Sequence, residues 1–274
     1  MKKQTFQDPI VESNSIEVLS KKLIAITNEL TIANQELAHA QRERSMMMSN
    51  ISHDLRAPIS AIRSAVDLLL LGQSLTEDDK QQAIKLIDRR TLTLETMIHD
   101  LYLLLTLDNN ELSFHFETIE ASPFFEEYFC NALIDERYND KNMYLDLSEN
   151  MSLTITIDIQ QMIRVLDNLF TNAAKYSHPD ADITLAVKPS SDANQLVIQV
   201  IDTGIGIPAE CLTNIFDRTY KVSLSRTPET ATGSGLGLCI VKSIIEKHKG
   251  HISCDSQINI GSTFTVLLPI TGTL

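Results

Sequence analysis

A histidine followed by an acid, His53-Asp54, is the first pair in this 274-residue chain that could do chemistry. Read as a helix, the segment around it carries an apolar stripe at steps of three and four, made up of Ile51, Leu55, Ile59, Ile62, Val66 and Leu69. At about 100° per residue, His53 lies roughly 160° from Leu55 and is predicted to face solvent. Pro58 removes a helical hydrogen bond, so we expect the helix to loosen or kink just after the histidine. An exposed imidazole with a free nitrogen could act as a nucleophile, although a solvated surface histidine is the simpler alternative.

A second polar cluster lies on one face of a predicted helix over residues 160–176. Asn168, Asn172 and Lys175 follow one another at steps of four and three, opposite apolar positions. The two amide oxygens could bind a hydrated Mg²⁺ that bridges phosphates, because Mg²⁺ keeps several waters and needs few protein ligands. Lys175 would then face phosphate, and Tyr176 would lie beside the base or sugar. The alternative is an ordinary solvated helix face.

A glycine-rich segment, Asp-Thr-Gly-Ile-Gly-Ile-Pro at 202–208, follows a predicted apolar strand. Gly204 and Gly206 permit close approach of a ligand, and the Asp202 carboxylate could accept a hydrogen bond from an adenine amino group. A plain turn is one alternative. An aspartic protease is a second, but that chemistry needs another carboxylate, and no second Asp-Thr-Gly or Asp-Ser-Gly occurs in this sequence.

The last cluster, Gly-Ser-Gly-Leu-Gly-Leu at 233–238, opens a predicted helix. Backbone N–H groups at such a helix start can bind an anion such as a triphosphate. The spacing does not match a dinucleotide fingerprint, which needs a glycine at 238, or a Walker loop, which needs a following lysine and hydroxyl residue. The residues concerned are Gly233, Gly235, Leu236 and Gly237.

Composition limits the classes of protein. The formal net charge of −13 argues against a nucleic-acid partner, and the four scattered cysteines fit a reducing, cytoplasmic compartment. No apolar run approaches the roughly 18 residues of a membrane span. We therefore expect a cytoplasmic protein, or the cytoplasmic part of a sensor whose membrane region lies outside this sequence.

Heptads dominate the N-terminal part of the chain. After a polar lead-in, apolar residues repeat every seven positions from Ile16 to Ala40, which predicts a parallel coiled-coil dimer, a single amphipathic helix being the alternative. The His53 helix and a second one, which Thr76 can cap and whose apolar seam runs from Ile84 to Leu105, are predicted to form a hairpin. Two such hairpins in a homodimer would bury their apolar stripes as a four-helix bundle.

The pattern changes after Asn110, where we place a domain boundary. The fold class expected is multidomain α and α+β: a lead-in and coiled coil over 1–44, the hairpin over 45–108, and an α/β sandwich with a mixed sheet over 109–274. In the sandwich we expect strands at 111–119, 143–147, 153–157, 183–187, 196–201, 252–255 and 263–267, and helices at 123–138, 160–176 and 236–248.

With the four motifs in order, the chain resembles sensor histidine kinases of bacterial two-component systems from about residue 45 onward. The segment 53–58 is similar to the phosphoacceptor box of that family, 168–176 to its Mg²⁺-binding asparagine box, and 202–207 and 233–238 to its glycine boxes. The resemblance implies a Bergerat-type ATP fold and a kinase that autophosphorylates His53 with ATP and Mg²⁺. It also implies transfer of the phosphoryl group to an aspartate in the receiver domain of a response regulator.

The sequence departs from this family at several positions. Thr219 stands where a second phenylalanine is usual, and Lys221 where an arginine often lies near the phosphates. Asp54 replaces the commoner glutamate and keeps a carboxylate to orient or deprotonate the imidazole. Ala57 replaces a polar residue that helps to position a hydrolytic water, so we expect a weak phosphatase. Two alternatives are an ATP-binding but catalytically degenerate dimeric scaffold, supported by Thr219, and an ATPase, for which Asp167 is a poor substitute for the required glutamate.

Overall fold

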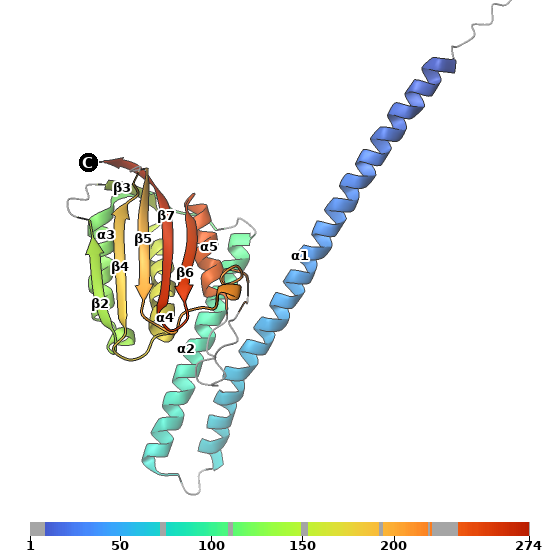
Figure 1. The fold of residues 1–274 in the computed structure, drawn as a ribbon. Helices are drawn as coiled ribbons and strands as arrows, with labels where there is room; N and C mark the ends of the chain where they lie inside the picture. Colours follow the sequence, from blue (N-terminus) through green and yellow to red (C-terminus); the bar gives the residue numbers. More distant parts are fainter. Residues whose placement is uncertain are drawn as a thin grey trace, which may run out of the picture. The chain divides into compact units, whose positions relative to one another are not determined.

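The computed structural model describes residues 9–71, 75–108, 112–148, 153–191, 194–218, 220 and 235–273. The chain divides into two compact units, residues 1–53 and 54–274. The first unit is the greater part of one long helix, α1 (Pro9–Leu71), coloured blue in Figure 1. Leu23 and Leu30, two of the predicted heptad positions, are 67% and 61% exposed in the single chain. The coiled-coil dimer that would cover them stays a prediction.

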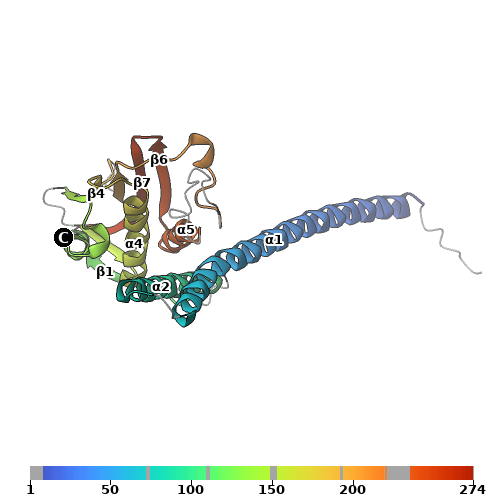
Figure 2. The ribbon, with the colours of Figure 1, turned by 90° about the horizontal axis from the view of Figure 1, so that it is seen from below.

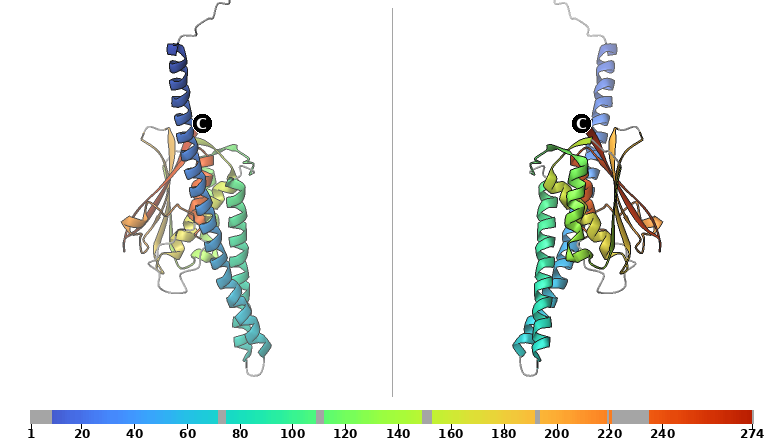
Figure 3. Two further views of the ribbon diagram at one scale, coloured as in Figure 1. Left: turned by 90° about the vertical axis from the view of Figure 1, so that its right-hand side faces the viewer. Right: turned by 90° about the vertical axis from the view of Figure 1, so that its left-hand side faces the viewer.

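The second unit begins with a helical hairpin. The end of α1 and α2 (Glu77–Asp108) run side by side in opposite directions (Figures 1 and 3). Helix α1 continues through Pro58, so the predicted loosening produces no interruption of the helix. The predicted cap of α2 is confirmed and reciprocal: the Asp79 N–H donates to Thr76 Oγ1 at 3.1 Å, and the Thr76 N–H donates to Asp79 Oδ2 at 2.9 Å.

A predicted strand over 111–119 is wrong for most of its length. Residues 112–116 form no regular structure, and the strand β1 is only Glu117–Glu120. The rings of Phe114 and Phe116 stack on each other and pack edge-on against His248, so these residues are held by side-chain contacts instead of a strand ladder.

A curled seven-stranded mixed sheet forms the rest of this unit, with the strand order β1-β3-β7-β5-β4-β2 and β6 paired to β7. Strands β2 and β4 pair in parallel, whereas the other pairs are antiparallel. Along β5 every second residue is buried, as expected for a sheet with one covered face. The remaining strand bounds are β2 (Asn142–Leu147), β3 (Leu153–Ile157), β4 (Asp182–Pro189), β5 (Gln195–Asp202), β6 (His251–Gln257) and β7 (Gly261–Thr273).

Helices α3 (Ala121–Leu133), α4 (Ile159–Lys175) and α5 (Gly237–Lys247) cover one face of this sheet, as Figure 3 shows. The predicted helix over 123–138 ends early: Asp135 accepts a hydrogen bond from the Arg137 N–H and starts a separate 3-10 turn, η1 (Glu136–Tyr138). A second short turn, η2 (Ala209–Cys211), follows β5. Layered helices on a mixed sheet agree with the fold class predicted from the sequence.

None of the helices in the described part of the chain combines the length and the apolar character that crossing a bilayer requires. The four cysteines are free thiols.

Candidate functional site

Helix α4 is the element on which the candidate site is built. It begins where the Asp158 side chain accepts a hydrogen bond from the Gln161 N–H at 3.1 Å. One face is buried in the core, and the opposite face carries Asn168, Asn172 and Lys175 at intermediate exposure. Figure 2 shows α4 and α5 adjacent on the same side of the sheet. The residues of the buried face are Met162, Val165, Leu166, Leu169, Phe170 and Ala173.

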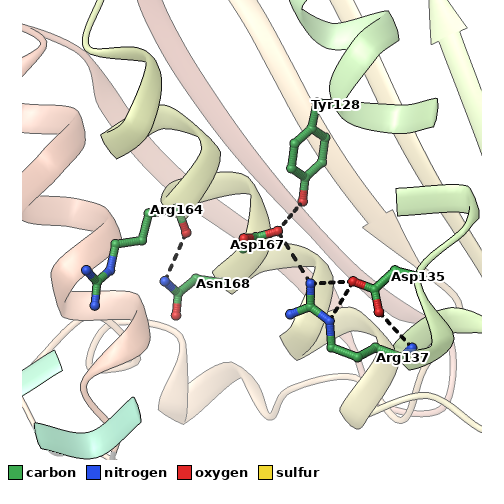
Figure 4. A network of polar contacts seen from close by, with 6 residues as sticks. All are labelled: Tyr128, Asp135, Arg137, Arg164, Asp167 and Asn168. Carbon is green, nitrogen blue, oxygen red and sulfur yellow. Dashed lines mark hydrogen bonds and ion pairs between the residues drawn. The ribbon is translucent and has the colours of Figure 1, made fainter. Parts of the chain in front are cut away.

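Asn168 is held between α4 and the start of α5. Its Nδ2 donates to the carbonyl oxygen of Arg164 at 3.0 Å, one turn earlier, and Asp167 points to the other side of the helix (Figure 4). A Cβ built on Gly237, the first residue of α5, would lie only 2.6 Å from Asn168 Oδ1. Because Gly237 has no side chain, the amino end of α5 approaches Asn168 closely. The amide oxygen therefore lies beside a helix start.

The N-terminus of α5 has the features of an anion site. Leu236 is the N-cap residue, among the described residues no side chain caps the helix, and Gly235 has a φ of +66°. The N–H groups of the first turn of a helix can bind an anion, and the helix dipole favours negative charge there. Leu236 itself is 1% exposed and anchors the segment in the core.

The loop after β5 packs against the other end of α4. The Ile205 N–H donates to the carbonyl oxygen of Tyr176 at 3.0 Å, and a Cβ on Gly204 would lie 2.5 Å from the same oxygen. Gly206 has a φ of +70° and its added Cβ would lie 2.1 Å from the Gln257 carbonyl. Glycine is therefore required at both positions, because a side chain would collide with a nearby carbonyl oxygen. At Gly206 the positive φ also favours glycine. This loop joins the end of α4 to the turn between β6 and β7.

Asp202 is a buried carboxylate, 6% exposed, at the end of β5. Its Oδ1 accepts hydrogen bonds from the Gly204 N–H at 2.8 Å and the Ser262 N–H at 3.3 Å. Burial raises the pKa of Asp202, and these two N–H groups oppose that rise. A carboxylate has about four acceptor positions, so Asp202 can accept a further donor from a ligand.

Lys175 and Tyr176 lie at the end of α4 nearest this loop. The ammonium of Lys175 lies over the Tyr176 ring, 4.9 Å from its centre, and the Tyr176 N–H caps the helix through the Asn172 carbonyl oxygen. Tyr176 is 41% exposed, so its ring is accessible to a ligand. Among the predicted site residues, Lys221 and Gly233 lie outside the described residues, as does Thr219.

The structure thus arranges the predicted residues along a single helix. Asn168 lies beside Gly237 at one place on α4, Asn172 follows one turn later, and Tyr176 lies against Gly204 at the end.

The sequence did not identify Ser262, which donates to Asp202 from a strand 60 residues away. It also missed Ser177, whose buried Oγ has no hydrogen-bond partner in the described part of the chain. No local pattern marks either residue.

His53 lies on α1 and is exposed, as predicted, and Asp54 is half-buried. These positions alone do not assign a chemical role to either side chain.

An adenine nucleotide fits the donor and acceptor set around α4. Backbone N–H groups at the α5 start suit phosphates, and the buried Asp202 suits an amino group. For a divalent cation the site offers amide oxygens from Asn168 and Asn172. The described residues contain no cluster of three or more His, Cys, Asp or Glu side chains that could hold a metal by themselves.

Two family models match the chain. Residues 157–272 match the model described as "Histidine kinase-, DNA gyrase B-, and HSP90-like ATPase". Residues 43–110 match the "His Kinase A (phospho-acceptor) domain". The first match includes every described residue of the α4 site, and the second includes His53.

Curated relatives agree with these models. The chain is 31% identical over 250 residues to the sensor histidine kinase WalK of Bacillus subtilis (strain 168), covering 90% of this chain and 39% of that protein. It is also 31% identical over 246 residues to the sensor protein kinase WalK of Staphylococcus aureus, covering 90% of this chain and 57% of that protein. The chain therefore spans well under two thirds of these relatives.

Solved structures support the fold. The histidine kinase AdeS of Acinetobacter baumannii superposes with a TM-score of 0.61 at 22% identity, over 80% of this chain and 98% of that chain. The histidine kinase ThkA in complex with the response regulator protein TrrA superposes with a TM-score of 0.65 at 20% identity, over 82% of this chain and 61% of that chain.

Proposed function

Because this chain belongs to the sensor histidine kinase family of two-component systems, we propose that it is an ATP-dependent protein-histidine kinase whose phosphoacceptor is His53. The observation that carries the proposal is the arrangement along α4, where Asn168 meets the start of α5 and Tyr176 meets the Asp202 loop. One helix then contacts both the phosphate end and the base end of a single nucleotide.

ATP is bound at the base end by Asp202, which accepts a hydrogen bond from the adenine amino group. Gly204 and Gly206 let the purine lie against the loop, and Tyr176 packs beside the base or sugar. At the other end, the N–H groups around Gly235, Leu236 and Gly237 bind phosphate oxygens, with Gly233 and Lys221 contributing from the segment between the glycine boxes. Lys175, whose ammonium lies over the Tyr176 ring, adds positive charge at that end of α4.

Asn172 and Asn168 provide amide oxygens for Mg²⁺. The hydrogen bond from Asn168 Nδ2 to the Arg164 carbonyl turns the amide so that its oxygen faces the start of α5, where phosphates are expected. When bound, Mg²⁺ neutralises phosphate charge and stabilises the leaving group. Few protein oxygens suffice because Mg²⁺ retains water ligands.

A ring nitrogen of His53 attacks the γ-phosphate, and ADP leaves. Asp54 accepts a hydrogen bond from the N–H of the other ring nitrogen, which orients the ring and stabilises its charged form. Phosphoryl transfer depends mainly on positioning and charge neutralisation, so an exposed imidazole needs little further activation. The phosphoryl group then passes to an aspartate in the receiver domain of a response regulator.

The working form is a homodimer, divided into a coiled-coil segment (1–44), the phosphotransfer hairpin (45–108) and the ATP-binding domain (109–274). Hairpin residues such as Ile84 and Ile98, 58% and 60% exposed in the single chain, would be covered in a dimeric four-helix bundle. We place the reaction in the cytoplasm, where ATP is supplied and thiols stay reduced. No nucleic-acid partner is proposed, since the chain is strongly acidic.

The experiment is incubation of the chain with ATP and Mg²⁺, followed by phosphosite mapping under conditions that preserve phosphohistidine. We expect acid-labile phosphate on His53 and none in the His53→Gln variant. Phosphate that persists in this variant at the same level refutes the assignment. An ATP-binding but inactive scaffold predicts nucleotide binding without any phosphohistidine, so the same experiment separates the two functions.

A further inference from the structure

A partly buried ion pair joins α2 to α4. Asp100 Oδ1 accepts a hydrogen bond from Arg164 Nη2 at 2.7 Å, and the two side chains are 11% and 21% exposed. Burying a charge is unfavourable unless an opposite charge and hydrogen bonds compensate for it. Each of these side chains therefore depends on the other, and the pair favours one arrangement of the two helices.

Arg164 also contacts the nucleotide site through its backbone. Its carbonyl oxygen accepts the hydrogen bond from Asn168 Nδ2, and Figure 4 shows the arginine and the asparagine on the same side of α4, opposite Asp167. The guanidinium binds the hairpin while the carbonyl orients the asparagine. Arg164 and Asn168 lie one helical turn apart on α4, so a shift of Arg164 moves Asn168 with it.

The second nucleotide helix lies against the hairpin as well. Helix α5 contacts both α2 and α4, and its first residue, Gly237, lies against Asn168. Both helices that offer groups to the phosphates therefore contact α2. A change in the position of α2 against α4 is transmitted directly to the phosphate end of the site.

We propose that Asp100 and Arg164 are positioning residues for phosphoryl transfer. Their ion pair fixes α4, and with it Asn168 and the nucleotide phosphates, at one place on the phosphotransfer hairpin. Transfer from a nucleotide on one domain to a histidine on another is sensitive to displacements of about 1 Å, so loosening this contact lowers the rate of transfer and spares nucleotide binding. The inference rests on the proposed kinase function.

The test compares Asp100→Asn with the unmodified chain. At saturating ATP we expect the rate of His53 phosphorylation to fall about tenfold, with the Kd for a fluorescent ATP analogue changed less than about twofold. The charge-swapped double variant Asp100→Arg, Arg164→Asp should recover most of the lost rate, because it restores the attraction in the opposite sense. Asp88→Asn is the matched control: Asp88 is an exposed aspartate on the same helix, and its loss should change neither quantity.

Two further measurements separate positioning from folding. Arg164→Lys keeps the charge but loses the fork geometry, so an intermediate rate is expected even if Asp100→Asn folds poorly. An equal loss of nucleotide affinity and rate would mean a merely structural role and would overturn the proposal. So would an unchanged or a faster rate in Asp100→Asn. If the unmodified chain forms no phosphohistidine, the proposed kinase function fails and this inference fails with it, whereas phosphorylation that is insensitive to these variants refutes the inference alone.

Discussion

The backbone N–H of Asp158 donates to Nε2 of His248 at 2.9 Å, which joins the start of α4 to the end of α5. His248 is 4% exposed, and its Nδ1 lies 2.8 Å from the carbonyl oxygen of Ile244. Nε2 must accept, so Nδ1 carries the proton and the ring is neutral in this arrangement. The Asp158 side chain meanwhile accepts from the His115 N–H at 2.9 Å. These contacts hold the segment before β1, the start of α4 and the end of α5 together.

This relationship predicts a pH-dependent stability. Burial lowers the pKa of His248, so the folded chain binds this proton less readily than the unfolded chain. The stabilisation is therefore fully present above the pKa of an unfolded histidine, about 6.5, and is lost as the pH falls through the lower folded value. The free energy of unfolding, measured with a denaturant between pH 7.5 and 5, should fall less steeply with decreasing pH in His248→Gln than in the unmodified chain. The two slopes should differ by up to about 1.4 kcal/mol per pH unit.

The control is His251→Gln, which removes an exposed histidine at the start of β6. Its pH slope should match that of the unmodified chain. Identical slopes in all three proteins would show that His248 does not titrate in this range.

Gly237→Ala should weaken nucleotide binding about tenfold or more. The added Cβ would lie 2.6 Å from Asn168 Oδ1, closer than real contacts allow, so the amide must move away from the start of α5. Titration with a fluorescent ATP analogue measures the effect. Gly272→Ala is the control, because its Cβ would meet only Thr154 Oγ1 at 3.0 Å, at the far end of β7. Unchanged affinity in Gly237→Ala would remove Asn168 from the proposed site.

Asp202→Asn should weaken ATP binding roughly 10- to 100-fold, since a hydrogen bond to a charged acceptor contributes about 1.5–3 kcal/mol. Burial raises the pKa of Asp202, so binding by the unmodified chain should also weaken as the pH falls through that raised value. The asparagine variant should lack this pH dependence. Isothermal titration with ATP at pH 7.5 and 5.5 checks both, and Asp255→Asn, an exposed carboxylate on β6, is the control.

Ala57→Thr should increase dephosphorylation of a partner response regulator. Alanine offers no hydrogen bond to a hydrolytic water, whereas threonine supplies a hydroxyl on the exposed side of α1 close to His53. The rate at which phosphorylated receiver domain loses its phosphate, with the unmodified or variant chain added, measures this. Equal rates, with the unmodified protein already fast, would contradict the prediction of weak phosphatase activity. Ala57→Val, similar in size but without the hydroxyl, should leave the rate low.

Helix periodicity, capping and strand alternation are local properties, and the sequence predicted them well. The Thr76 cap, the two-faced helix α4 and the alternating burial of β5 all depend on residues within one or two turns of each other. The glycines at 204 and 206 could be recognised from the local motif, although the groups that they approach, Tyr176 and Gln257, lie elsewhere in the sequence. The motifs could be recognised in the sequence because their spacing is local.

One error arose where contacts distant in sequence outweigh local preference. Phe114 and Phe116 were read as part of a strand, yet they pack on His248, more than 130 residues later. The helix predicted over 123–138 ends early for a local reason, because Asp135 accepts from the Arg137 N–H and starts a separate turn. The packing of Phe114 and Phe116 on His248 cannot be inferred from a short stretch of sequence around either phenylalanine.

By itself, the sequence determined the candidate residues of the proposed site: a histidine, two asparagines, an aspartate at the end of a strand and two glycine-rich segments. Only the tertiary structure decided how those residues meet, because Ser262 reaches Asp202 through strand pairing, Gly237 reaches Asn168 through helix packing, and Asp100 reaches Arg164 through a partly buried ion pair. Hydrogen bonds and charges of this kind act over a few ångströms in space, whatever the distance along the chain.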